Sequence, residues 1–149
     1  MVRPEDGQSV AAERISDCLR DGSATLDLSH LRLETIPESL TALTHLTALN
    51  LRVNKLTVLP EWLGDLTALT FLDLGGNELT ALPESLGNLT HLTELNLHDN
   101  NLTVLPESLG HLTALTTLDL GGNELTALPE SLGNLTHLTE LNLHDNNLT

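Results

Sequence analysis

Two His-Asp pairs in this sequence consist of residue types that can bind a metal ion. They are His98-Asp99 and His144-Asp145, and 46 residues separate them. In the repeat described below they fall two strands apart, which separates their backbones by about 9–10 Å. Zinc holds each donor atom within about 2.3 Å, so the two histidines converge poorly on one ion. We therefore interpret them as solvated polar residues, and we expect neither a metal nor a cofactor.

Other patterns that could support catalysis are incomplete. The pairs Gly75-Gly76 and Gly121-Gly122 do not form a phosphate-binding loop, because no Gly-Lys-Ser/Thr follows them and Lys55 is the last lysine. We expect these glycines to relieve crowding where a strand ends. Serine, histidine and aspartate are frequent, but they follow the repeat and form no set of nucleophile, base and orienting group around a pocket. The sequence therefore predicts a protein without enzymatic activity.

The charge of the chain is strongly acidic and unevenly distributed. The net charge is −15, and beyond Lys55 there is neither lysine nor arginine. Such a surface repels phosphate backbones and anionic lipid headgroups, so we expect neither nucleic acid nor a membrane as partner. A protein partner with a basic surface fits better. The alternative is that the acidity only keeps a leucine-rich chain in solution.

Cysteine usage favours a reducing compartment. Cys18 is the only cysteine, which excludes an internal disulfide. The first ten residues lack the basic and then apolar order of a signal peptide. We therefore predict a cytoplasmic protein.

An internal duplication organises the chain. Residues 118–149 are identical to residues 72–103, which read LDLGGNELTALPESLGNLTHLTELNLHDNNLT. Each copy contains a second period of 23 residues. A period of 20 to 50 residues indicates a stacked solenoid. We predict a tail and capping helix over 1–22, followed by a repeat array over 23–149 with about five and a half repeats. The identity of the two copies fits a recent tandem duplication or an engineered consensus array.

Each repeat predicts one strand and one buried asparagine. Leu72 and Leu74 alternate with Phe71, Asp73 and Gly75, as in a short strand with one buried face, and successive strands would pair in parallel. A buried amide can satisfy backbone groups of its own layer and the next, so we predict a ladder of asparagines. Its members are Asn54, Asn77, Asn100, Asn123 and Asn146. Leu31 takes this position in the first layer.

The return arm of each repeat begins at a proline. Pro83 has its φ angle preset, and Pro-Glu-Ser-Leu then predicts a short helical turn that Gly87 ends. Trp62 stands on this arm where other layers have serine, and we expect it to pack rather than to bind a partner.

A capping helix precedes the array. Ser9 is the expected N-cap of a helix from Val10 to Arg20, and Asp21-Gly22 would end it. Its apolar residues share one face, which can cover the open end of the first layer. That face consists of Ala11, Ile15, Cys18 and Leu19.

The pattern LxxLxLxxNxLxxLPxxLxxLxx, from about Leu26 to Thr149, resembles the leucine-rich repeat family. The 23-residue form is similar to the intracellular class found in Ras-binding scaffolds and bacterial signalling proteins, and the opening is similar to the first layer of bacterial Roco-type proteins. The resemblance implies an α/β fold, a right-handed horseshoe-shaped solenoid. It further implies a parallel sheet on the concave face, short helical or irregular arms on the convex face, and protein binding on the concave side.

Outward-facing strand residues of successive layers form columns, and these predict the partner-binding face. Phe71 is the only aromatic residue there, and aromatic and arginine side chains dominate many interfaces, so we predict it as a contact centre. The alternative is an incidental substitution, since the twin layer has Thr117. The predicted contact residues are Arg52, Phe71, Asp73, Glu94, Asn96, His98, Asp119, Glu140 and Asn142.

The sequence stops at Thr149, partway through a sixth layer, without a polar closing element. We expect Leu141, Leu143 and Leu148 to present an apolar edge. Two further interpretations follow from this edge. The chain could be a structural array that forms homo-oligomers through its C-terminal end, or a fragment of a larger signalling protein.

Overall fold

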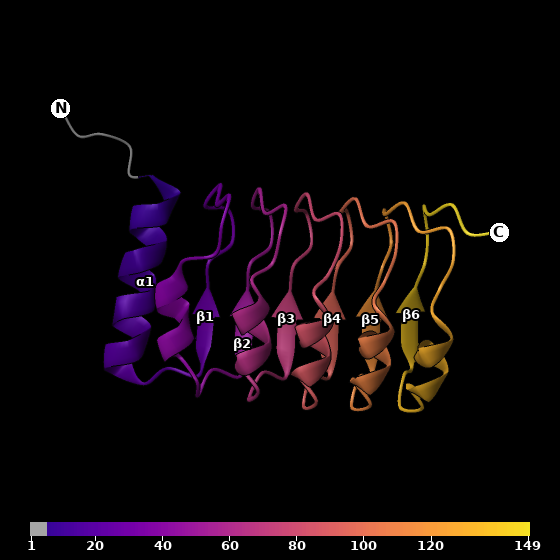
Figure 1. Ribbon diagram of the computed structural model, residues 1–149. Helices are drawn as coiled ribbons and strands as arrows, with labels where there is room; N and C mark the ends of the chain where they lie inside the picture. The colour runs from indigo at the N-terminus through magenta and orange to yellow at the C-terminus, as the bar shows by residue number, and fades with distance from the viewer. Residues whose placement is uncertain (1–5) are drawn as a thin grey trace.

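The structure, a computed structural model, describes residues 6–149 (Figure 1). The predicted tail falls largely outside this range. One helix, α1 (Gly7–Asp21), precedes six strands that alternate with five short 3-10 helices. The strands are β1 (Thr25–Asp27), β2 (Ala48–Asn50), β3 (Phe71–Asp73), β4 (Glu94–Asn96), β5 (Thr117–Asp119) and β6 (Glu140–Asn142). The 3-10 helices are η1 (Glu38–Ala42), η2 (Glu61–Asp65), η3 (Glu84–Asn88), η4 (Glu107–His111) and η5 (Glu130–Asn134).

The six strands form one parallel sheet in the order of the chain, as predicted. Every pair of neighbours keeps a register of 23 residues, so that Leu49 lies beside Leu72 and Leu72 beside Leu95. In Figure 1 the layers stand in a row from α1 to the C-terminus, with the 3-10 helices on one side of the sheet. The prolines that precede these helices therefore lie on the arm side, away from the outer face of the sheet.

The core is a stack of leucines from successive layers. Leu49, Leu72, Leu95 and Leu118, one from each of four neighbouring strands, are at most 1% exposed. Burying one such side chain contributes about 1.5–3 kcal/mol. Identical layers bring identical shapes together, which explains how a core with so little variety of side chains can be closely packed.

Helix α1 covers the N-terminal end of the array, but it begins earlier than predicted. Asp6 is the N-cap rather than Ser9, and its carboxylate accepts a hydrogen bond of 2.9 Å from the Ser9 backbone N–H. Gly22, with a φ of 68°, ends the helix as expected. The prediction for Leu19 was wrong, since it is 53% exposed. At about 100° per residue it lies roughly 100° around the helix from Cys18, at the edge of the buried stripe.

A left-handed residue follows each strand at the same position of every layer. The residues are His30, Val53, Gly76, Asp99, Gly122 and Asp145, with φ between 54° and 69°. Glycine adopts this conformation freely, whereas a β-branched side chain is strained in it. The second glycine of each Gly-Gly pair is thus explained by backbone conformation rather than by crowding.

Replacing Val53 with glycine is expected to raise the free energy of unfolding by about 1 kcal/mol, because relief of the backbone strain exceeds the entropic cost of glycine. Val58 is the matched control, since it is also exposed but its φ is not in the left-handed region. Val58→Gly should lower stability by about 0.5–1 kcal/mol. Urea unfolding followed by circular dichroism measures both, and destabilisation by Val53→Gly would contradict the assignment of strain.

The return arms form the predicted helical turns, with one difference of detail at their C-terminal end. Gly87 lies inside η3 rather than at its end, and Leu89 follows as the C-cap, with its N–H donating to the Leu86 carbonyl at 3.2 Å. The role of Gly87 is a close contact with the next layer: an added Cβ would lie 2.5 Å from the Ser108 carbonyl oxygen. Trp62 is partly buried and packs against the core, as expected.

Candidate partner-binding face

The outer surface of the sheet carries the residues predicted to bind a partner. We call it the strand face, and it consists of the first and third residues of each strand and the residue two positions beyond the third. Neighbouring strands lie about 4.8 Å apart, so equivalent residues form columns. The columns are Thr25, Ala48, Phe71, Glu94, Thr117, Glu140; Asp27, Asn50, Asp73, Asn96, Asp119, Asn142; and Ser29, Arg52, Gly75, His98, Gly121, His144.

The middle column is tied to the backbone of its own layer. Each Asp or Asn in it accepts a hydrogen bond of 2.9–3.0 Å from the N–H two residues later, at the end of the strand. Asp and Asn alternate here because both offer the acceptor oxygen that this turn needs. One oxygen of each side chain is therefore engaged within the chain, a structural role that the sequence interpretation missed.

Asp73 has less free surface than a contact residue would offer. It is 8% exposed, and its Oδ1 accepts a hydrogen bond from the Gly75 N–H. Its Oδ2 lies 3.8 Å from Nη1 of Arg52, whose side chain is 43% exposed. Arg52 therefore covers this carboxylate, and the pair presents mainly the guanidinium to solvent. Asn96, Asp119 and Asn142 are partly exposed.

The first column provides the most accessible carboxylates. Glu94 and Glu140 are exposed at β4 and β6, and neither has a basic side chain within ion-pair distance among residues 6–149. Phe71 is partly buried and lies in register between Ala48 and Glu94. One aromatic ring beside free carboxylates can contact a partner's apolar side chain while the carboxylates bind its cations.

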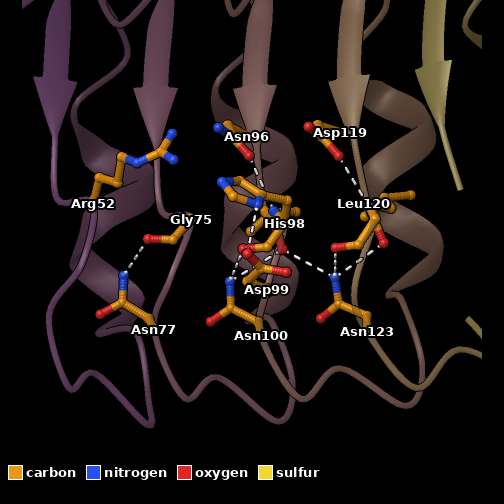
Figure 2. A network of polar contacts seen from close by, with 12 residues as sticks. Arg52, Gly75, Asn77, Asn96, His98, Asp99, Asn100, Asp119, Leu120 and Asn123 are labelled. Atoms are coloured by element: carbon orange, nitrogen blue, oxygen red, sulfur yellow. Dashed lines mark hydrogen bonds and ion pairs between the residues drawn. The ribbon is translucent and has the colours of Figure 1, made fainter. Parts of the chain in front are cut away.

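His98 is more enclosed than a solvated histidine. Its ring lies over Gly75, where an added Cβ would be 2.6 Å from the ring Cδ2. Its Nδ1 lies 3.0 Å from Oδ2 of Asp99, and its Nε2 is buried without a hydrogen-bond partner in residues 6–149 (Figure 2). The first glycine of the pair therefore makes room for the imidazole of the next layer. His144 is exposed.

The asparagine ladder lies just beyond the C-terminal ends of the strands. Asn77, Asn100 and Asn123 stand in a row in Figure 2. The Oδ1 of Asn100 accepts a hydrogen bond from the Leu79 N–H, and its Nδ2 donates to the carbonyls of Leu74 and Leu97, all at 3.0 Å. The same three contacts recur at Asn54, Asn77, Asn123 and Asn146. Each asparagine thus joins its own layer to the preceding one and fixes the position of the strand face.

The first layer has no asparagine of its own, but the ladder still reaches it. The Leu31 N–H donates to Oδ1 of Asn54 at 3.1 Å, and the Leu33 N–H donates to the same oxygen at 3.0 Å. Leu31 itself packs against the core. Asn54 therefore supplies an acceptor to two backbone donors of that turn.

The pKa values of two of the described residues are shifted, and neither residue is among the predicted contact residues. The Ser29 hydroxyl donates to Asp27 at 2.6 Å and holds the pKa of that carboxyl below its ordinary value. Burial raises the pKa of the Cys18 thiol, which keeps it protonated at neutral pH.

Within residues 6–149, no three His, Cys, Asp or Glu side chains come close enough to hold a metal ion. No helix in that range has the length and apolar character that crossing a membrane requires.

The last layer exposes part of its apolar interior. Leu141 is 44% and Leu148 37% exposed, whereas their counterparts in the identical copy, Leu95 and Leu102, are at most 1% exposed. Leu143 is partly buried and packs against the core. Two of the three leucines predicted at this edge are therefore accessible.

Comparisons with known proteins give one consistent result. The sequence model described as "Leucine rich repeat" matches residues 24–79, and the one described as "Leucine-rich repeat region" matches residues 83–148. The comparison with curated proteins gives no match.

Three solved structures illustrate the likeness. YopM from Yersinia enterocolitica is 34% identical with a TM-score of 0.82, and the alignment covers 99% of this chain and 31% of that one. The leucine-rich repeat domain of the type III effector XopL is 29% identical with a TM-score of 0.86, covering 94% and 50%. A leucine-rich repeat protein of Leptospira interrogans is 32% identical with a TM-score of 0.71, covering 98% and 42%. The chain spans half or less of the length of these three proteins.

Proposed function

The chain belongs to the leucine-rich repeat family, and we propose that it is a non-enzymatic binding module whose acidic strand face binds a protein with a basic surface. The family is generally a protein-interaction fold, and similar solved structures include leucine-rich repeat domains of bacterial effectors. The proposal extends this general role to one surface and one partner chemistry. A reducing, cytoplasmic setting is part of it, since the single cysteine is buried and unpaired.

The observation that carries the proposal is the unpaired charge on a rigid surface. Glu94 and Glu140 are exposed and have no cation beside them among residues 6–149, and the layers that hold them contain neither lysine nor arginine. The asparagine ladder keeps these layers in fixed positions, so a partner would lose little free energy in ordering the surface. Phe71 supplies an apolar contact next to Glu94.

A selection from a random displayed peptide library tests the proposal while the identity of the partner is open. We expect the selected peptides to be enriched in lysine and arginine. Their affinity should fall at least about tenfold for the double variant Glu94→Lys/Glu140→Lys, because two attractions become repulsions. Fluorescence polarisation at two salt concentrations measures the effect, which should shrink at high salt.

The matched control is Glu78→Lys/Glu124→Lys. These glutamates are exposed beside the asparagine ladder, off the strand face, and the control changes the net charge by the same amount over the same spacing. It should leave affinity within about twofold apart from long-range attraction. Peptides without basic residues, or equal losses in the two variants, would contradict a specific role for the strand face.

Self-association is a second candidate, favoured by the exposure of Leu141 and Leu148 beside β6, which within residues 6–149 pairs with β5 alone. An unpaired edge with apolar side chains can pair with another copy. The acidity of this half of the chain opposes such contacts. Light scattering over a range of concentrations distinguishes the candidates, since a monomer throughout excludes self-association and leaves the binding-module proposal unaffected.

A further inference from the structure

A second surface, separate from the strand face, lies on the arm side of the stack. Each return arm begins at a proline that follows a leucine, or an isoleucine in the first layer. The residue directly before that leucine or isoleucine is exposed, and in four successive layers it is valine or alanine. These residues are Val58, Ala81, Val104 and Ala127, and we call them the valine strip. All four are exposed, with Val58 at 70% and Val104 at 61%. Because the layers are in register, these four exposed apolar side chains stand in one column on the surface.

Grooves lie between neighbouring residues of the valine strip. One groove of about 210 Å³ lies between Val58 and Ala81, and a second of about 360 Å³ lies between Ala81 and Val104. Both grooves are lined by Ala81 and Leu82, so they adjoin one another. Ala81, with its short side chain, stands between the larger Val58 and Val104 and lines both grooves.

A row of glutamates borders the same grooves. Glu61 lines the first groove, and Glu84 and Glu107 line the second. They belong to a column in which a glutamate opens every 3-10 helix of the array: Glu38, Glu61, Glu84, Glu107 and Glu130. All five are exposed, and none has a basic side chain within ion-pair distance in residues 6–149. A partner that fits this surface would have an apolar face with lysine or arginine side chains beside it.

The distance between successive layers indicates which backbone conformation a segment bound along the stack would have. Backbone hydrogen bonds join successive layers just before the valine strip, for example from the Glu78 N–H to the Leu56 carbonyl at 2.8 Å, which sets the layers about 4.8 Å apart there. Residues three or four apart in an α-helix advance about 4.5–6 Å, so a helix laid along the stack can offer one side chain to each layer. Alternate residues of an extended strand advance about 6.6–6.8 Å and fall out of step by about 2 Å per layer.

We propose that the valine strip is a docking surface for an amphipathic α-helix of a partner protein, with apolar side chains at i, i+3 and i+7 and with lysine or arginine beside them. The apolar side chains would fill the hollows at Ala81, and the cations would reach Glu61, Glu84 and Glu107. This is recognition of a helix in a groove. The surface is independent of the strand face, so either proposal can fail without the other.

The probe is a labelled synthetic helical peptide with leucine at i, i+3, i+7 and i+10 and lysine at the flanking positions. We expect Val58→Thr/Val104→Thr to weaken its binding about tenfold, because these changes keep the shape of the side chains but make the strip polar. Glu61→Gln/Glu84→Gln/Glu107→Gln should weaken binding about tenfold as well. A peptide with serine in place of the leucines should not bind.

The matched control is Glu13→Gln/Glu78→Gln/Glu124→Gln, which removes three charges away from the grooves and from the strand face and should change affinity less than about threefold. All substituted residues are exposed, so thermal unfolding should be the same for every variant. Equal losses in the two glutamine triples would show unspecific attraction and overturn the proposal. Binding that survives the two threonine substitutions, or that the serine peptide reproduces, would overturn it too.

Discussion

Replacing Asn100 with alanine is expected to lower the free energy of unfolding by about 3–5 kcal/mol, a large effect for one substitution. The side chain is 5% exposed and joins three backbone groups: the Leu79 N–H and the carbonyls of Leu74 and Leu97. Alanine leaves all three without a partner in the interior. Each buried polar group left unsatisfied costs about 1–3 kcal/mol.

The duplication provides a control with the same local sequence. Asn146 occupies the position of Asn100 in the second copy and makes the equivalent contacts with Leu125, Leu120 and Leu143. It is only partly buried, so water can reach the groups that alanine would leave. We expect Asn146→Ala to cost about 1 kcal/mol in urea unfolding. Equal costs at the two positions would contradict the argument that burial, rather than the asparagine contacts as such, sets the penalty.

The ladder also connects stability with the candidate site. The Nδ2 of Asn100 lies 3.3 Å from the His98 carbonyl, in addition to its shorter contacts, and His98 belongs to the strand face. The carbonyl of the same residue accepts a hydrogen bond from the Gly76 N–H of the preceding layer. A change at Asn100 should therefore disturb the strand face as well as the core, and binding measurements on this variant would not separate the two effects.

The 23-residue period was sufficient to place most of the fold. A strict repeat means that one correct assignment of Leu72 to a strand holds for every layer, and the register of the sheet follows from it. The same reasoning placed Asn100 in one column with its equivalents. The period shows which residues occupy the same position in successive layers. Predictions that depend only on this equivalence, such as the strand register and the column of asparagines, agree with the structure.

Periodicity does not report how closely a residue is packed, and there the sequence interpretation was incomplete. Asp73 belongs to an outward-facing column, yet a turn contact and Arg52 cover most of it. His98 lies over Gly75 because the glycine leaves space, which is a property of two neighbouring layers together. At the first helix, Leu19 satisfied the apolar spacing but lies at the edge of the buried stripe. Each of these differences depends on contacts between elements.

Gly87 is the position where this distinction has the largest expected consequence. Sequence reasoning assigned it to the end of a turn, but it lies inside η3 and faces the next layer. An added Cβ would lie 2.5 Å from the Ser108 carbonyl oxygen and 2.8 Å from the Ser108 Cβ. Gly64 and Gly110 have equivalent contacts with Ser85 and Ser131, at 2.3 and 2.5 Å from the carbonyl oxygens. Glycine therefore sets how closely the arms of neighbouring layers approach.

Gly87→Ala is expected to lower the free energy of unfolding by about 2–3 kcal/mol, because backbone atoms of the next layer must move apart to admit the methyl group. Gly133 is the same residue of the second copy, with the same neighbours in sequence and with no atom within 4 Å of an added Cβ. Gly133→Ala should leave stability unchanged or raise it by up to about 1 kcal/mol, since alanine restricts the unfolded chain. Urea unfolding of the two single variants measures the difference. If both substitutions were neutral, the close approach of the arms would be wrong, and if both were equally harmful, glycine would be required by the turn itself.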